Sequence, residues 1–176
     1  MSDKRRRFMF FLSLGFALCL GVVIVGARLG FRINSTDSVP VGIYRQTTDP
    51  RAPYLAFCPP AEQIRIANER GYRPRGIGCA DGFAPLLKPI RARAGDVVTV
   101  SQLGIAVNGS LIPNSVARRA DGQGRGLPVV QFGVYKVAPD TVWAISSYNS
   151  ASFDSRYFGP VSLRRIVSYA KPVWTF

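Results

Sequence analysis

A strongly apolar segment runs without a charged residue from Phe8 to Ala27. Twenty helical residues extend about 30 Å, which is the hydrocarbon thickness of a bilayer. Four basic residues precede this segment at positions 4–7. The pattern predicts a cytoplasmic basic tail at residues 1–7 and a transmembrane anchor at residues 8–27. A cleaved signal peptide is the alternative, because Val25-Gly26-Ala27 resembles a small-residue cleavage site.

Beyond residue 38 the pattern is mostly that of strands. The segments concerned are rich in Val, Ile, Tyr and Phe, which suit a pleated sheet. Asn108-Gly109 stands between two short apolar runs and predicts a tight hairpin. One segment, Ala61–Arg70, has the periodicity of a helix. The sequence therefore predicts a mainly β domain attached to one helix. Its strands are expected within residues 39–45, 96–101, 104–107, 129–137, 141–147 and 164–174.

The composition narrows the possible chemistry. The 176 residues include no histidine and only three cysteines. Catalytic triads and zinc sites that depend on histidine are therefore excluded, and too few thiols remain for a four-cysteine zinc site. Acid–base chemistry must use lysine, a carboxylate, tyrosine or a chain terminus. No metal, nucleotide or organic cofactor is expected.

The charge distribution bears on location and partners. The chain carries 23 basic and 10 acidic residues, of which four basic and one acidic precede residue 8, so residues 28–176 have a net charge of +10. Basic residues flank the apolar segment on both sides, but long domains translocate largely regardless of charge. We therefore expect a single-pass protein of the inner membrane with residues 28–176 in the periplasm. This basic domain should face anionic phospholipid. No nucleic acid is expected as a partner, because the arginines are spread along the chain without a binding motif.

Cys58 and Cys79 lie 21 positions apart in the predicted outer domain. In an oxidising periplasm the two thiols should form a disulfide. Closing a loop of this size stabilises a fold by about 3 kcal/mol. Two buried reduced thiols are the alternative.

Without histidine, a serine hydroxyl can still be activated by a neutral lysine amine. The free lysine pKa of about 10.4 must then fall, and burial supplies that direction. The chain has four lysines. Lys88 is the best candidate, because the surrounding stretch Ala84–Ile90 is apolar enough to desolvate its amine.

Three segments resemble, in the same order, the signal peptidase I family of membrane-anchored Ser-Lys proteases. They are Asn34–Tyr44 after the apolar segment, Lys88–Asp96, and Ser152–Val161 with its Asp-Ser-Arg-Tyr box. The hairpin at Asn108-Gly109 also fits. The resemblance covers most of residues 28–176. It implies a signal-peptidase-like catalytic β domain that follows one N-terminal transmembrane helix.

The resemblance also implies residue roles. Ser38 would be the nucleophile and Lys88 the general base. Thr36 would join the backbone N–H of Ser38 in an oxyanion hole, and Ser152 would orient the lysine. The alternatives are turn or cap roles for Ser38 and Thr36, a snorkelling Lys88 and a solvated Ser152.

Asp154 and Arg156 are expected to form an ion pair that holds the late loop against the site. A carboxylate too close to Lys88 would raise the pKa of the amine. Asp154 is therefore assigned to support of the site rather than to proton transfer. Two independent surface charges are the alternative.

A shallow apolar substrate groove is a further expectation. Its candidate residues follow the nucleophile directly, and they are also suited to be core strand residues. They are Val39, Pro40, Val41 and Ile43.

Departures from the family pattern indicate a subgroup. Val39 stands where ordinary signal peptidases have methionine, and Ser146-Ser-Tyr-Asn149 replaces the usual Gly-Asp-Asn lead. These features look like the conjugal-transfer peptidases of the TraF type, which implies a pilin precursor or another membrane-presented preprotein as substrate. That resemblance also implies an acyl-enzyme, resolved by water or by the pilin's own amine to give a cyclic product. A general signal peptidase and a non-enzymatic component of a conjugation or secretion channel are the alternatives.

Overall fold

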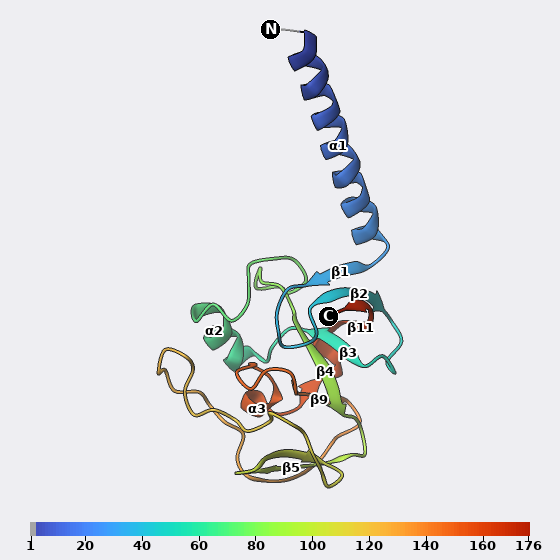
Figure 1. Cartoon of the computed structure of the whole chain (residues 1–176). Helices are drawn as coiled ribbons and strands as arrows, with labels where there is room; N and C mark the ends of the chain where they lie inside the picture. The colour runs from blue at the N-terminus through green and yellow to red at the C-terminus, as the bar shows by residue number, and fades with distance from the viewer. Residues whose placement is uncertain (1–2) are drawn as a thin grey trace.

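Helix α1 (Asp3–Arg28) contains the apolar segment. In the computed structural model, which describes residues 3–176, it stands apart from the rest of the chain with its apolar side chains exposed (Figure 1). Its 26 residues extend about 39 Å, enough to cross a membrane. Among the described residues it is the one helix with the length and composition of a membrane anchor or a signal sequence. The helix ends next to β1, so it joins the domain at an edge of the larger sheet.

Two antiparallel sheets form the domain that follows α1. The larger has the strand order β1-β2-β11-β3-β4-β9-β10, and the smaller has the order β7-β6-β5-β8. The larger sheet comprises β1 (Phe31–Asn34), β2 (Gly42–Thr47), β3 (Tyr54–Phe57), β4 (Leu86–Ala92), β9 (Thr141–Ala144), β10 (Val161–Ser162) and β11 (Ile166–Thr175). The smaller comprises β5 (Val97–Ser101), β6 (Gly104–Val107), β7 (Ser110–Leu111) and β8 (Gly133–Lys136).

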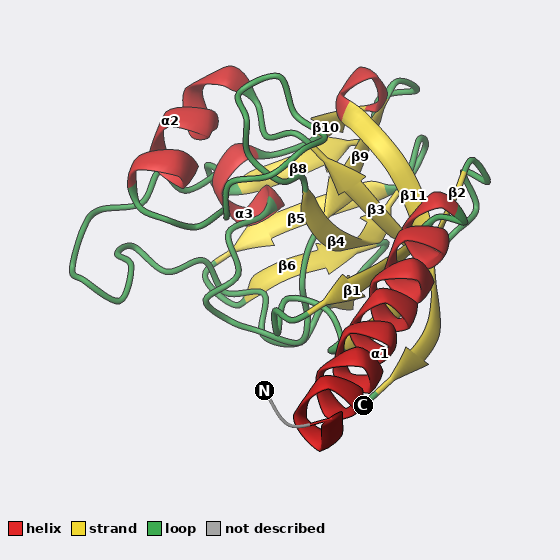
Figure 2. Ribbon diagram, turned by 90° about the horizontal axis from the view of Figure 1, so that it is seen from above, coloured by secondary structure: helices red, strands yellow, loops and turns green. Residues whose placement is uncertain are grey.

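Short helices complete the domain. These are α2 (Ala61–Glu69), α3 (Ser155–Phe158) and a 3₁₀ turn (Leu163–Arg165). Figure 2 shows α2 and α3 beside each other on one side of the strands. A core cluster that includes Leu55, Leu86 and Ala144 joins β3, β4 and β9, and Tyr157 of α3 packs into it. This packing fixes β4, the strand that carries Lys88.

The predicted mainly β fold is confirmed. Each predicted strand segment overlaps an observed strand, and α2 ends within one residue of the predicted helix. The hairpin also forms: Asn108 and Gly109 connect β6 to β7 with φ of 49° and 82°, as a tight turn with two left-handed residues requires.

Strands β1, β3, β4 and β10 lie outside the predicted strand segments. In β4 the obstacle is Pro89, which occupies an interior strand although proline donates no ladder hydrogen bond. Hydrogen bonds at neighbouring groups keep the strand paired despite the missing donor. Ile145 N donates to the Pro89 carbonyl at 3.1 Å, and Ile90 N donates to the Pro53 carbonyl at 2.8 Å.

A disulfide joins Cys58 and Cys79, with Cα atoms 5.8 Å apart. It ties the end of β3 to the loop-rich segment that leads into β4. Cys19 of α1 is free and exposed.

Candidate active site

Ser38 lies in the loop of residues 35–41 that connects β1 to β2. The two strands close around this loop with Asn34 paired to Gly42. Gly42 has a φ of +150°, and a Cβ atom there would lie 2.1 Å from the carbonyl oxygen of Trp174. A glycine is therefore required at the end of the loop, because the last strand of the chain passes against its backbone.

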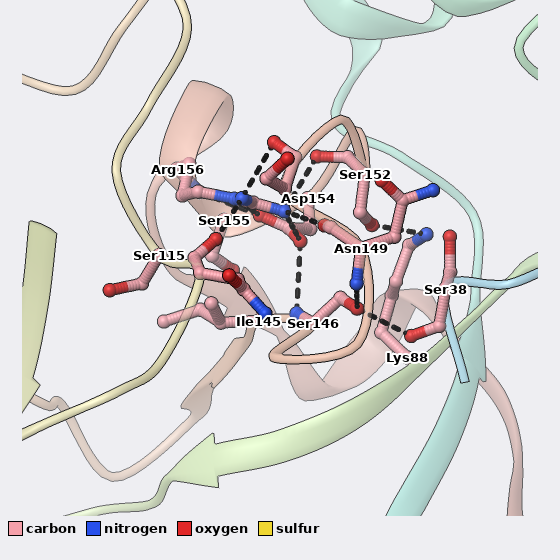
Figure 3. Close-up of polar contacts among 12 residues, drawn as sticks. Ser38, Lys88, Ser115, Ile145, Ser146, Asn149, Ser152, Asp154, Ser155 and Arg156 are labelled. Atoms are coloured by element: carbon pink, nitrogen blue, oxygen red, sulfur yellow. Dashed lines mark hydrogen bonds and ion pairs between the residues drawn. The ribbon is translucent and has the colours of Figure 1, made fainter. Parts of the chain in front are cut away.

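Lys88 extends from β4 into the interior, and its side chain is only 4% exposed. Its amine donates a hydrogen bond of 2.8 Å to the Ser152 hydroxyl oxygen (Figure 3). Burial lowers the pKa of Lys88 from 10.5 to about 8, since desolvation disfavours the charged amine. The Asp154 carboxylate raises this pKa and the Arg156 guanidinium lowers it. A substantial fraction of the amine is therefore neutral near pH 8.

Ser38 and Lys88 line the same two cavities. The larger has a volume of about 550 Å³ and the smaller about 340 Å³. Figure 3 shows the two side chains facing one another beside Ser152. The Ser38 N–H has no acceptor among residues 3–176, so it is available to a bound group. A substrate carbonyl in either cavity would meet a hydroxyl, a buried amine and a free backbone donor.

Asp154 and Arg156 form a fully buried ion pair, with both side chains 0% exposed. The guanidinium donates two hydrogen bonds to the carboxylate, from Nε to Oδ1 at 2.8 Å and from Nη2 to Oδ2 at 2.7 Å. Asp154 also caps α3 by accepting from the backbone N–H of Arg156. The guanidinium also donates to backbone carbonyls of the surrounding loops, those of Asn114, Asn149, Ser150 and Ser152, with one proton of Nη2 shared between two acceptors. The pair thereby fixes the loop that presents Ser152 to Lys88.

Ser146 connects this loop to Ser38, a contact that sequence reasoning missed. Its hydroxyl donates to the Ser38 carbonyl at 2.6 Å, and its backbone N–H donates to Asp154 Oδ2 at 3.0 Å. The hydroxyl also accepts the N–H groups of Tyr148 and Asn149. The available signal was the unusual Ser-Ser-Tyr-Asn segment eight residues before Asp154.

Thr36 lines both cavities with Ser38. Its hydroxyl donates to Asn34 Oδ1 at 2.8 Å, so in this structure its proton is engaged with Asn34. Asn34, to which no role was assigned from the sequence, is buried at the end of β1.

The expected groove residues lie elsewhere. Val39 is 0% exposed and packs with Tyr44, Tyr54 and Ala170, so it is a core residue rather than part of a substrate groove. Neither cavity is lined by Val39, Pro40, Val41 or Ile43. The Val39 side chain points inward, and the carbonyls of Ser38, Val39 and Pro40 accept hydrogen bonds from Ser146 and Asn34. The apolar wall of the larger cavity comes instead from Tyr72, Pro74, Ile77, Leu86, Leu87 and Ala170.

A metal has no evident site in the described part of the chain. No three side chains among its cysteines and carboxylates gather closely enough to hold an ion.

Comparison with known proteins assigns the family. The family model described as "Signal peptidase, peptidase S26" matches residues 9–175. The chain belongs to this family of serine peptidases. Two plasmid transfer proteins TraF of Escherichia coli are similar to it, one 38% identical over 84% of both chains and the other 36% identical over 90% of this chain and 96% of the relative. A conjugal transfer protein TraF of Agrobacterium tumefaciens (strain 15955) is 37% identical over 98% of both chains.

Membership in the S26 family gives the buried lysine beside Ser38 a chemical context. The peptide-bond hydrolysis of a serine peptidase needs a nucleophile, a base and a donor for the developing oxyanion. Groups of these three kinds meet at the two cavities, on the loop after β1 and on β4.

Proposed function

We propose that this protein is a membrane-anchored Ser-Lys endopeptidase that processes a pilin precursor in conjugation. The observation that carries the proposal is the buried amine of Lys88, with a pKa lowered to about 8, on the same cavities as the Ser38 hydroxyl. A solvated lysine would be protonated at neutral pH and could not act as a base.

In the proposed reaction, the Ser38 oxygen attacks the scissile carbonyl while Lys88 accepts the hydroxyl proton. The negative oxygen that develops is stabilised by the Ser38 N–H, with Thr36 as a second donor once its hydroxyl leaves Asn34. The C–N bond then breaks, and the leaving amine takes the proton from Lys88. The Ser152 hydroxyl keeps the Lys88 amine in position by accepting its 2.8 Å hydrogen bond.

The resulting ester has two possible fates. Water restores the serine and releases a linear product. Alternatively, an amine attacks the same carbonyl to form a peptide bond; the ester C–O bond breaks and the proton lost by the amine returns to the Ser38 oxygen. A held amine competes well because proximity raises its effective concentration. Following the TraF-type resemblance, we propose that the N-terminus of the pilin is this amine, which gives a cyclic product.

Location follows from the same proposal. Residues 8–27 would anchor the protein in the inner membrane, with residues 1–7 in the cytoplasm and 28–176 in the periplasm. The site loop begins seven residues after α1 ends, so it would lie near the phospholipid headgroups. Precursors presented from the bilayer would reach it there. The conjugal-transfer names of the relatives support the assignment to conjugation.

The test is mass spectrometry of candidate pilin precursors co-expressed with the wild-type chain, Ser38→Ala or Lys88→Ala. We expect the wild type alone to yield processed pilin, while circular dichroism shows both variants folded. A product lighter by one water than the linear cleaved chain identifies cyclisation. Processing by either variant at the wild-type rate would refute the Ser-Lys assignment and favour a non-enzymatic channel component.

A second experiment separates the specialised role from a general one. The protein is expressed in cells depleted of their own signal peptidase. We expect no rescue of growth, and rescue would contradict pilin specificity.

A further inference from the structure

The loop that carries Ser38 has few backbone hydrogen bonds. It contains a turn at Asp37 and Ser38, and the Phe176 N–H donates to the Val41 carbonyl at 3.1 Å. A loop with so few such bonds relies largely on side chains to define its conformation. Its carbonyls are accordingly held from outside: Ser146 donates to Ser38 O, and Tyr44 donates to Pro40 O at 2.7 Å.

Asn34 makes most of these contacts with a single carboxamide. Its Nδ2 donates to the carbonyls of Thr36 at 2.7 Å, Val39 at 3.2 Å and Pro40 at 3.1 Å. Its Oδ1 accepts from the Thr36 hydroxyl at 2.8 Å and from the Thr36 N–H at 3.3 Å. The carboxamide is thus hydrogen-bonded to the loop before Ser38, at Thr36, and after it, at Val39 and Pro40.

The orientation of this carboxamide is determined by its partners. Carbonyl oxygens accept only, so the group facing three of them must be the NH₂. The other atom is then the oxygen, and the Thr36 hydroxyl must be its donor. Asn34 therefore also controls where the Thr36 proton points.

We propose that Asn34 is the positioning residue of the nucleophile loop: its carboxamide sets the loop conformation that directs Ser38 toward Lys88. It does not touch the reacting atoms and acts through the backbone of residues 36–40. The inference rests on the proposed peptidase function for its kinetic consequences, whereas the structural role can be measured without any activity.

Two variants of the full chain in detergent test the proposal. Asn34→Leu removes all five contacts at similar volume. Asn34→Asp keeps the acceptor for Thr36 but removes both protons that reach the three carbonyls. Ile105→Val, a buried position on β6 of the smaller sheet, is the control for a general loss of stability.

The kinetic readout uses the pilin precursor that the wild type processes. Displacement of a reacting group by about 1 Å costs on the order of 100-fold in rate. We expect kcat to fall about 100-fold in both Asn34 variants, with KM within about threefold of the wild type, as ground-state binding is retained. The pH at half-maximal kcat in Asn34→Leu should stay at the wild-type value, because the burial of Lys88 is unchanged. Ile105→Val should change neither constant.

The second readout is limited proteolysis within residues 35–41, which reports how well the loop backbone is held. We expect cleavage there to accelerate at least about tenfold in both Asn34 variants and to match the wild type in Ile105→Val. Unchanged cleavage and unchanged kcat in Asn34→Asp would overturn the inference. If the wild type processes no precursor but loop cleavage responds as expected, the peptidase proposal fails and the positioning role stands.

Discussion

Replacing Lys88 by methionine should stabilise the protein while it abolishes processing. Lys88 is only 4% exposed, and methionine has a side chain of similar length, so the buried space that Lys88 occupies stays filled. In the wild type, lowering the Lys88 pKa from 10.5 to about 8 means that folding opposes protonation of a buried amine. Each pKa unit corresponds to about 1.4 kcal/mol, so the penalty is on the order of 3 kcal/mol at pH values below 8.

The substitution also removes one favourable contact. Ser152 loses the 2.8 Å hydrogen bond from the amine, and a buried polar atom without its partner costs about 1–3 kcal/mol. The two contributions have opposite signs. The expected balance at pH 6.5 is a gain of about 0–2 kcal/mol for Lys88→Met.

The pH dependence identifies the cause. Between pH 8 and 10.5 the unfolded chain keeps the proton on Lys88 and the folded chain does not, so the stability of the wild type rises with pH. The penalty is complete below pH 8 and absent above 10.5. The advantage of Lys88→Met should therefore be constant below pH 8 and shrink or reverse by pH 10.

Urea unfolding of both proteins at pH 6.5 and pH 10, in one detergent, measures the difference. Lys136→Met is the control, because Lys136 is exposed on β8 and the substitution changes the net charge equally. It should leave stability nearly unchanged at both values. A Lys88→Met variant less stable than the wild type at pH 6.5, or a difference independent of pH, would refute the argument from burial.

Two further predictions concern the supports of the site. Ser152→Ala removes the acceptor of the Lys88 amine, and we expect a decrease in kcat of about 10- to 100-fold with KM nearly unchanged; an equal rise in KM would indicate a binding role instead. Replacing both Cys58 and Cys79 by serine opens a bridge of 21 residues, and we expect urea unfolding to show a loss of about 3 kcal/mol, which reducing agent reproduces in the wild type alone.

The sequence predicted those parts of the molecule that local patterns determine. The uncharged run of α1, the hairpin at Asn108-Gly109 and helix α2 all follow from neighbouring residues and formed as expected. Strand β4 did not follow, because Pro89 argues locally against an interior strand, while its partners come from β3 and β9. Long-range pairing overrides local propensity here.

The candidate site divides in the same way. Lys88 was found by elimination among four lysines, and its apolar neighbours explain its burial. Ser146 was missed because its contact to Ser38 spans 108 positions. Val39 was assigned to the substrate groove because it follows the nucleophile, yet a loop held by side chains turns it into the core. Direction of a loop side chain depends on such contacts, which residue spacing does not reveal.

The buried pair of Asp154 and Arg156 reconciles two opposing needs of the site. The loop needs a rigid anchor, but an unpaired carboxylate near Lys88 would raise the pKa of the amine and keep it protonated. Bidentate pairing with Arg156 offsets that effect, since the guanidinium lowers the Lys88 pKa as the carboxylate raises it. A buried ion pair is a weak source of stability. The pair matters here because of what it holds in place. The guanidinium donates to four loop carbonyls, and the carboxylate accepts from the Ser146 N–H, while the Ser146 hydroxyl donates to the Ser38 carbonyl.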